Sequence, residues 1–421
     1  MKLTNIFLLA TALTFQISRG ADETNLLADT KTIISNAEQM KTLRKEVDDA
    51  EAAYMKSAVS DENSDQTEKL WNSYKQLNNT NFPKIFELAR QQPKSERAFE
   101  MFEWIVTNRF IQTPTALQTG GLQSMEFLRD YYATNPNIAR TCRIVGSRWE
   151  PTCQPVIDFL QIAADKNPDR EVRGQATFAL ARVTKDKADL LVAWEDNSHR
   201  AWFEKHGINL LEEEKNGGSK KAFLTANELF QTVLNKYADC PTLQPTNTWQ
   251  YKATLGEAAK GELFELDHLS LGKVAPEIEG EDIDGKKLKL SDYRGKIVVL
   301  SFWASWCGPC MAMVPSEVRL AERMKGKPFT LVGVNGDGIR DDAKHAVEKE
   351  KMTWPSFWSI KGPDGPIPTS WNVSGWPTVF VLDSNGVIRF KSEGYGGTNT
   401  ENILNQKIDR ILDRFADKTH P

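Results

Sequence analysis

The chain contains little cysteine: only five of its 421 residues are Cys. Small exported domains that depend on disulfides use far more, which excludes a disulfide scaffold as the basis of this fold. Histidine is equally scarce, and none of the five His residues lies at metal-ligand spacing to another. Because a zinc site built on closely spaced cysteines needs a second ligand pair, we predict no metal.

An excess of positive charge is also missing. The sequence has 53 basic and 57 acidic residues, which gives a formal net charge of -4. A nucleic-acid binder needs a basic surface that attracts phosphates, so nucleic acid is not expected as a partner.

Long apolar segments are absent after the N-terminus. There, a basic residue is followed by the apolar stretch Ile6–Ile17 and by the small residues Ser18 and Gly20 before Ala21. This pattern predicts a signal peptide at residues 1–20, with an uncleaved anchor as the alternative. Because no later stretch approaches the roughly 20 apolar residues that span a bilayer, the mature chain is expected to lack an integral membrane segment. We therefore expect an extracytoplasmic protein, either periplasmic or secreted.

The chain is long enough for more than one hydrophobic core, at about three times the length of a common domain. With 40% hydrophobic and 26% charged residues, its composition is that of ordinary globular proteins. The sequence pattern changes near Leu271, from almost purely helical to alternating strands and helices. We predict a multi-domain chain with an all-α domain at residues 21–265 and an α/β domain at residues 266–421.

The predicted helical domain shows no strand signals. Apolar residues recur every three or four positions from Ile33 to Tyr54, which predicts a long amphipathic helix that packs on other helices. About three heptads are also close to the minimum for a two-stranded coiled coil, so the oligomeric state is left open. Pro93, Pro136 and Pro168 precede further amphipathic helices, in an arrangement similar to degenerate TPR or HEAT hairpins. A docking or spacer role is the default expectation for this domain.

The C-terminal half alternates between strand and helix patterns, which indicates an α/β domain. The run Lys296–Trp303 is short, apolar and β-branched, as a buried central strand is. The pair Asp284–Gly285 predicts a hairpin turn. The other expected elements are a helix at 307–324, a strand at 329–334, a helix at 342–350, a strand at 378–382, an edge strand at 387–390 and a helix at 401–415.

Cys307 and Cys310 are the only closely spaced cysteines, and they directly follow the predicted central strand. A free thiol with a pKa of about 8.5 is mostly protonated at neutral pH, but unpaired N–H groups and the dipole at a helix start stabilise a thiolate. Cys307 occupies that position, and Pro309 suits the first turn because it has no N–H. We predict Cys307 as the nucleophile and Cys310 as the shielded resolving thiol. Covalent haem is not expected, because Met311 stands where haem attachment needs histidine.

The sequence around this pair resembles the thioredoxin superfamily. The segment Phe302–Cys310 (FWASWCGPC) is followed downstream by Gly375–Thr378 (GWPT) ahead of a predicted strand. Three upstream segments make residues 270–415 most similar to the exported TlpA-like and ResA-like branch: Val274–Pro276, Asp284–Lys286 and Tyr293–Lys296. The resemblance implies a thioredoxin-like fold, thiol-disulfide oxidoreductase activity and a cis bond between Trp376 and Pro377. A trans proline that merely starts a strand is the alternative.

The resemblance also implies the partners and the redox group. Substrates would be proteins with disulfides or thiols, an upstream redox partner would restore the cysteines, and the Cys307–Cys310 disulfide would act without a separate cofactor. The dipeptide Gly308–Pro309 is similar to that of reducing thioredoxins, which favours a disulfide reductase. Trp306 and Trp376 flank the cysteines and Pro377, so we expect them on the substrate groove and most other tryptophans in the core.

Two acids typical of these proteins are missing. Thioredoxins bury an acid six residues before the first cysteine, where this chain has Ser301. The ResA-like branch often has a glutamate three residues after the second cysteine, where this chain has Met313. The proton acceptor for Cys310 is therefore not identified, and Glu317, further along the same predicted helix, is expected to face solvent.

The other cysteines have no assigned chemistry. Cys142 lies on an apolar helix face, which predicts a buried thiol, with a Cys142–Cys153 disulfide as the alternative. Cys240 has no evident partner.

Two other functions stay open. A peroxiredoxin-like thiol peroxidase shares the fold, but Leu300 and Ala304 stand where such enzymes have proline and threonine. The second is a cell-envelope binding protein in which the helical domain is the functional part.

Overall fold

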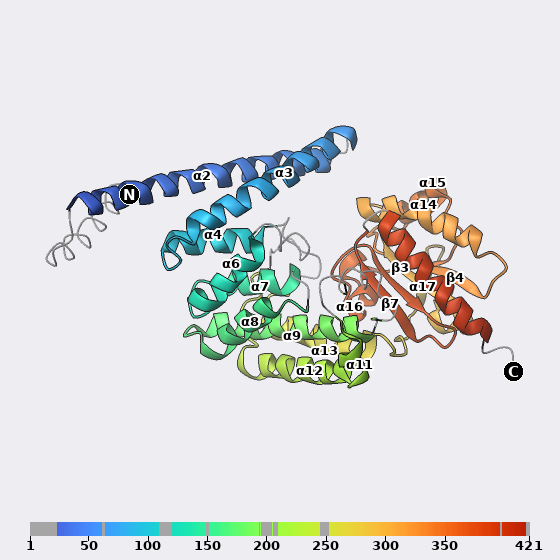
Figure 1. Ribbon diagram of the computed structural model, residues 1–421. Coiled ribbons are helices and arrows are strands. Elements are labelled where there is room, and N and C mark those ends of the chain that lie inside the picture. Colours follow the sequence, from blue (N-terminus) through green and yellow to red (C-terminus); the bar gives the residue numbers. More distant parts are fainter. Residues whose placement is uncertain are drawn as a thin grey trace. The chain divides into compact units, whose positions relative to one another are not determined.

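The structure is a computed structural model that describes residues 23–60, 64–108, 120–148, 151–192, 194, 204, 209–244, 252–395 and 398–417. The signal peptide predicted at residues 1–20 lies outside these ranges. Contacts within the chain divide it into two compact units, residues 1–167 and 168–421. Figure 1 labels many of the helices and strands of both units.

The described part of the first unit is helical. Its α-helices are α2 (Glu23–Ser60), α3 (Ser64–Ala89), α4 (Glu96–Thr107), α6 (Gly121–Phe127), α7 (Ala139–Arg148) and α8 (Gln154–Lys166), with a π-helical turn at Leu128–Tyr132 after α6. The apolar stripe of α2 packs on α3, where Val47 is buried and the ring of Tyr54 lies 5.0 Å from that of Trp71. These helices range from 7 to 38 residues, so the described helices of this unit do not form a repeat of constant length.

The second unit begins with α9 (Arg170–Val192), α11 (Leu211–Lys215), α12 (Gly218–Lys236) and α13 (Leu255–Phe264), which a π-helical turn extends over Glu265–Leu269. Helices α9 and α12 pack along each other, with the rings of Phe178 and Phe230 5.7 Å apart. Helix α13 begins at a capping box in which Thr254 and Glu257 satisfy each other's backbone N–H groups.

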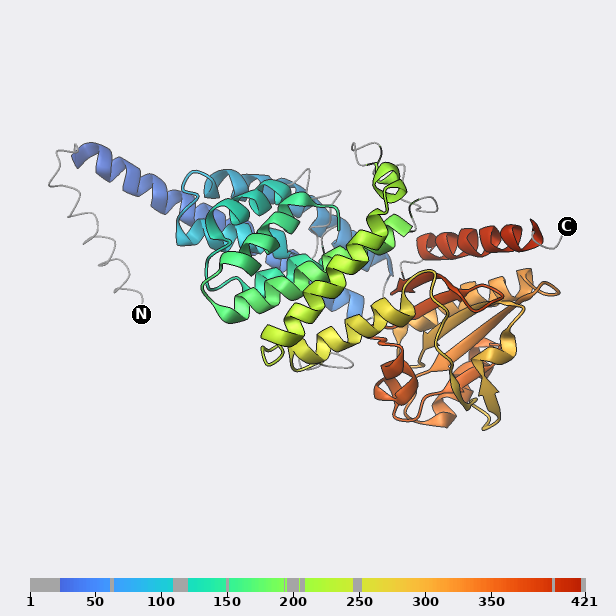
Figure 2. The ribbon, with the colours of Figure 1, turned by 90° about the horizontal axis from the view of Figure 1, so that it is seen from below.

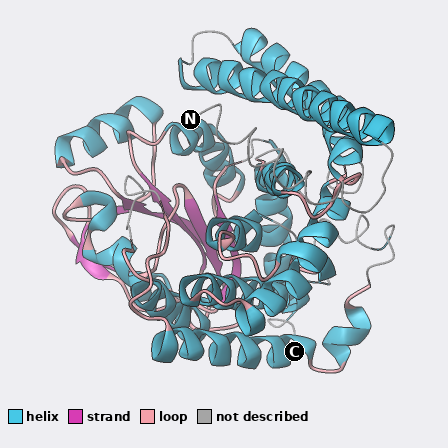
Figure 3. Cartoon of the chain, turned by 90° about the vertical axis from the view of Figure 1, so that its left-hand side faces the viewer, coloured by secondary structure: helices cyan, strands magenta, loops and turns pink. Residues whose placement is uncertain are grey.

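The rest of the second unit contains the strands, which Figure 3 shows gathered in one region. A hairpin of β1 (Glu279–Glu281) and β2 (Lys287–Lys289) precedes the main sheet. The strands of the main sheet and the α-helices that connect or follow them are β3 (Ile297–Trp303), α14 (Gly308–Arg323), β4 (Phe329–Asn335), α15 (Arg340–Glu350), β5 (Ser356–Trp358), α16 (Pro366–Ser370), β6 (Thr378–Leu382), β7 (Ile388–Glu393) and α17 (Thr398–Asp417). The strand order is β5-β4-β3-β6-β7, with β3 parallel to β4 and antiparallel to β6. The predicted helical half and α/β half are both confirmed.

Alternation along the central strand β3 separates two cores. Val298, Leu300 and Phe302 face one side of the sheet, where Phe302 packs on Trp371 and Phe380. Ile297, Val299 and Trp303 face the other side, which α14 and α17 cover. Figure 2 shows α17 along that face of the sheet. Because side chains alternate along a strand, Ser301 also belongs to the face that α14 covers.

A buried ionic cluster joins the helices of the second unit to its sheet. The carboxylate of Glu265 accepts hydrogen bonds from Lys185 (2.8 Å), Lys391 (2.9 Å) and Asn372 (2.7 Å). Lys185 also pairs with Glu262. The sequence predicted a domain boundary between residues 265 and 266, next to Glu265 of this cluster. The compact unit that contains the sheet instead begins at Pro168 and includes α9, α11, α12 and α13. The sequence pattern indicates where the strands begin. It does not predict which helices pack on the strands, so the link from α9 through Glu265 to β7 could not be expected.

Candidate redox site

The end of β3 and the start of α14 place the two cysteines. Cys307 is the N-cap residue of α14, and its sulfur accepts a hydrogen bond from the backbone N–H of Cys310 at 3.1 Å. Pro309 lies in the first helical turn, where a missing N–H costs nothing. Cys307 is 5% exposed and Cys310 is fully buried. The two sulfurs form a disulfide with an S–S distance of 2.00 Å.

The loop before β6 completes the site from the opposite strand. The peptide bond between Trp376 and Pro377 is cis. Thr378 follows directly and pairs with Phe302 at the end of β3, so the proline lies beside the β3–α14 connection. The ring of Trp376 lies 5.8 Å from that of Trp306, which is 43% exposed. The structure therefore brings together the two cysteines, the proline and both tryptophans that the sequence singled out.

The loop after β4 holds the cysteine loop, and this contribution was not predicted. The buried carboxylate of Asp337 accepts hydrogen bonds from the amide (3.1 Å) and hydroxyl (2.7 Å) of Ser305 and from the side-chain amide of Asn335 (2.6 Å). The backbone oxygen of Asp337 also accepts a hydrogen bond from the Trp358 ring at 3.0 Å. Asn335 and Asp337 at the end of the predicted strand could have indicated this contact. The carboxyl ends of parallel strands meet at the same edge of a sheet, which places these residues near the end of β3.

Gly336 lets this loop approach the tryptophans closely. Its backbone oxygen accepts a hydrogen bond from the Trp306 ring at 3.2 Å. A Cβ atom at this position would lie 2.6 Å from the ring of Trp376. Only glycine fits between the two rings without displacing one of them, so the loop fixes both.

Glu317 is buried, and the expectation that it faces solvent is wrong. It lies on α14 and is 2% exposed. Burial raises the pKa of its carboxyl to about 7, an effect that the nearby Ser301 hydroxyl offsets only in part. The helix periodicity places Cys310, Met313, Val314 and Glu317 on one face, and all four are buried against the sheet. Because glutamate is a charged residue, Glu317 was expected to be exposed to solvent. Its position on the buried face of α14 determines that it is buried.

The remaining cysteines lie apart from this site. Cys142 is fully buried, as predicted, and burial raises the pKa of its thiol. No disulfide joins Cys142 to Cys153, both of which the structure describes, so that alternative is wrong. Cys240 is buried and its sulfur lies 3.3 Å from the Arg170 guanidinium, a contact that the sequence did not indicate.

Most tryptophans near the site belong to the core, as expected, with Trp303, Trp354 and Trp371 buried. Within the described ranges, no group of three or more His, Cys, Asp or Glu side chains is arranged to hold a metal ion.

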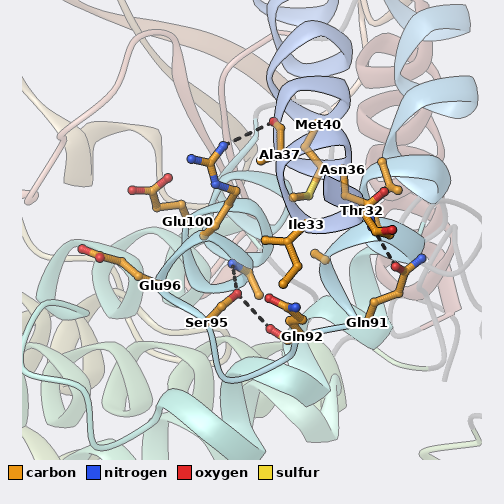
Figure 4. Close-up of a pocket in the computed structure, with 14 residues that line it drawn as sticks. Thr32, Ile33, Asn36, Ala37, Met40, Gln91, Gln92, Ser95, Glu96 and Glu100 are labelled. Atoms are coloured by element: carbon orange, nitrogen blue, oxygen red, sulfur yellow. Dashed lines mark hydrogen bonds between the residues drawn. The ribbon is translucent and has the colours of Figure 1, made fainter. Parts of the chain in front are cut away.

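The first unit contains a hollow of about 760 Å³ between α2 and the α3–α4 connection. Figure 4 shows that Ile33, Asn36 and Met40 of α2 line one side and Gln91, Gln92 and Ser95 the other. The side chain of Asn36 donates to that of Gln91 at 2.8 Å across it. Its lining contains no cysteine or histidine.

Comparison with known proteins places a family match in the C-terminal part of the chain. Residues 271–391 match the AhpC/TSA family. The thioredoxin-like protein YneN of Bacillus subtilis is 32% identical over 141 residues, which are 33% of this chain and 78% of that protein. Thiol-disulfide oxidoreductase ResA of Bacillus cereus is 30% identical over 152 residues, which are 36% of this chain and 84% of that protein.

Among solved structures, the thioredoxin domain of a thiol-disulfide oxidoreductase from Bacteroides vulgatus is 29% identical. The match covers 33% of this chain and 98% of that one, with a TM-score of 0.30.

The cysteine pair at a helix start, the facing cis-proline and the five-stranded mixed sheet define a thioredoxin-like redox domain. With curated relatives that are covered over most of their length, the chain belongs to the ResA-like family of thiol-disulfide oxidoreductases. It is therefore an oxidoreductase. The α-helices in the described ranges are each too short or too polar to cross a bilayer.

Proposed function

We propose that this chain is an extracytoplasmic protein-disulfide reductase in which Cys307 is the nucleophile and Cys310 the resolving thiol. The observation that carries the proposal is the different placement of the two sulfurs. Cys307 caps α14 and accepts a backbone hydrogen bond, whereas Cys310 is fully buried one turn further along. Amide hydrogen bonds and the helix dipole favour a thiolate at Cys307.

The reaction follows from this placement. The Cys307 thiolate attacks one sulfur of a substrate disulfide, and the other substrate sulfur leaves as a thiolate. Cys310 then attacks Cys307, which forms the internal disulfide and releases the second substrate thiolate. The substrate gains two electrons, and an upstream redox partner returns them to the enzyme. No separate cofactor takes part in this scheme.

An apolar surface around the site supports an extended protein substrate. Trp306 is 43% exposed, and the next two loops at this edge of the sheet carry Ile339 and Ile360, which are 62% and 59% exposed. These loops follow the parallel strands β4 and β5. They lie close together, because a Cβ atom on Gly362 in the loop after β5 would be 3.0 Å from the backbone oxygen of Gly336 in the loop after β4. Exposed apolar groups that cluster in this way favour contact with an unfolded or extended chain.

The proposed location rests on the sequence pattern at residues 1–20. A short apolar stretch with small residues before Ala21 supports export and removal of the segment. Exported cysteine pairs meet substrate disulfides that the cytoplasm does not maintain, which agrees with a reductase outside it.

Covalent trapping tests the proposed order of attack. The Cys310→Ser variant is expected to hold substrates as mixed disulfides on Cys307, because no thiol remains to resolve them. The Cys307→Ser variant is the matched control and is expected to trap none. Mass spectrometry of both variants after incubation with cell-envelope extract identifies the substrates. Equal trapping by the two variants contradicts the assignment of the nucleophile.

A thiol peroxidase is the second candidate, because residues 271–391 match the AhpC/TSA family. Leu300 and Ala304 occupy the positions where such enzymes carry proline and threonine, which argues against it. Peroxide consumption without insulin reduction by the wild-type protein favours the peroxidase. If neither substrate reacts, the helical domain is the functional part and the chain is a binding protein.

A further inference from the structure

We propose that Glu317 is the proton acceptor for Cys310: it takes the thiol proton when Cys310 opens a mixed disulfide and returns it when the internal disulfide is reduced. The inference rests on the proposed oxidoreductase cycle and deepens it. The group is a buried carboxyl on the helix that carries the cysteines, and it has no charged partner among the described residues.

The helix geometry directs Glu317 toward Cys310. Seven residues separate the two on α14, so they lie on one face about 10 Å apart along the axis. Side chains on a helix lean toward its N-terminus, which brings the carboxyl back toward Cys310. The intervening residues of this face, Met313 and Val314, are buried and apolar. A general base accepts a proton either in direct contact or through one bridging water molecule.

The surroundings of Glu317 leave its carboxyl without an ionic partner. Within the described part of the chain, neither its Oε1 atom nor the Ser301 hydroxyl completes a hydrogen bond. Ser301 lies on β3 beneath the helix, so a polar pair is buried in an otherwise apolar layer. An isolated buried carboxyl favours its protonated form, and burial raises its pKa to about 7. A group that titrates there exchanges protons in both directions at neutral pH.

The elements around Glu317 carry no charge that holds it in one state. On the facing strands β3 and β6, the residues of this core are apolar apart from Ser301. Helix α17 contributes Leu404 and Ile408 to the core, while its Glu401 and Asp409 pair with Arg319 and Arg323 of α14. The titratable groups that share this face of α14 in the described structure are therefore the cysteines themselves.

The proton and electron transfers balance. The Glu317 carboxylate takes the proton of Cys310, whose thiolate then attacks the sulfur of Cys307 in the mixed disulfide. The bond between Cys307 and the substrate breaks, and the substrate sulfur leaves with the electron pair as a thiolate. Reduction by an upstream dithiol reverses the path, so Cys310 leaves as a thiolate and regains the proton from Glu317.

Stopped-flow reaction of the reduced protein with the aromatic disulfide dithiobis(nitrobenzoate) separates the two steps. Attack by Cys307 releases one coloured thiolate, and resolution by Cys310 releases the second. Glu317→Gln is expected to slow the second release about 100-fold at neutral pH, as loss of a general base does, while the first is unchanged. The wild-type second phase is expected to rise with pH around 7, an inflection that the variant loses.

Three further variants make the test specific. Glu322→Gln changes an exposed carboxyl on the same helix and is expected to leave both phases as in the wild type. Glu317→Leu places an apolar side chain of similar size in an apolar core, so it folds even if the amide does not, and it must slow the second phase equally. Glu317→Asp is expected to restore part of the rate, because it keeps an acceptor.

The outcomes distinguish this inference from the proposed function. A wild-type protein that releases neither thiolate fails as an oxidoreductase through Cys307. If the wild type shows both phases and Glu317→Gln and Glu317→Leu keep the wild-type second phase with its pH profile, the oxidoreductase stands and the role of Glu317 is overturned.

Discussion

Ser305 and Asp337 are joined by three hydrogen bonds at the edge of the sheet that carries the cysteines. The Ser305 amide donates to both carboxylate oxygens of Asp337 at 3.1 Å, and its hydroxyl donates to one of them at 2.7 Å. Ser305 lies two residues before Cys307 on the connection between β3 and α14, and Asp337 follows β4. The parallel neighbour of the central strand therefore holds the loop that presents the nucleophile.

Asp337→Ala is expected to loosen this loop. Two donors on Ser305 and one on Asn335 lose their acceptor, which costs about 2 kcal/mol of unfolding free energy in a buried site. The orientation of Cys307 becomes less fixed, so its rate of attack on a disulfide falls. Urea unfolding and the first phase of the aromatic-disulfide reaction measure the two effects. Asp341→Ala, which removes an exposed carboxylate on α15, serves as the control, and equal effects of both substitutions would contradict the account.

Glu265→Ala is expected to separate the helices of the second unit from its sheet. Burial alone would raise the pKa of Glu265, but Lys185 and Lys391 hold it well below the usual range. The carboxylate therefore stabilises the fold above its ordinary pKa of 4.5, and this stabilisation is lost as acid protonates it. Removing it leaves two ammonium groups without this partner, at a cost of about 3 kcal/mol.

The control for Glu265 is Glu279→Ala, which breaks the exposed pair with Lys289. Surface pairs contribute less than about 1 kcal/mol, so urea unfolding of this variant should match the wild type. If both variants unfold at the same urea concentration, the cluster is not what connects α9 and α13 to the strands.

Glu317 predicts a specific pH dependence of stability. Its pKa is about 7 in the folded protein and 4.5 as its ordinary value, so the folded state keeps a proton that the unfolded state loses. The stabilisation from this proton is complete below pH 4.5, falls between 4.5 and 7, and is absent above that. The loss is on the order of 3 kcal/mol.

The measurement is the difference in unfolding free energy between wild type and Glu317→Gln across this pH window. Taking the difference cancels the opposite, stabilising trend of carboxylates with lowered pKa, such as Glu277 and Glu265. A difference that stays constant with pH would mean that the carboxyl titrates normally and is not desolvated.

The chemistry at the helix start could be predicted from sequence, because the residues that carry it are contiguous. A buried β-branched strand, a cysteine pair and a proline in the first turn each have a local signature. The proline loop was predictable through its resemblance to thioredoxins. The three-residue strand β5 at Ser356–Trp358 was missed, since it is too short for alternation to be visible and follows Pro355.

The contacts that support the site could not be predicted, because they join residues far apart in the chain. Asp337 and Ser305 are 32 residues apart, and Glu265 and Lys391 are 126 apart. The buried position of Glu317 is a different case, because the helical spacing from Cys310 was visible. The prediction that Glu317 is exposed relied on its charge and not on this spacing. Functional sites are where a buried ionisable group is expected, so the spacing was the better guide.

The pH dependence of alkylation at Cys307 tests the central claim most directly. In the Cys310→Ser protein, the rate of reaction with iodoacetamide, followed by mass spectrometry, reports the fraction of Cys307 thiolate. A sulfur stabilised by the start of α14 should titrate at about pH 7 or below. A midpoint at about 8.5 or higher, as for an ordinary or buried thiol, would contradict a helix-activated nucleophile at this position.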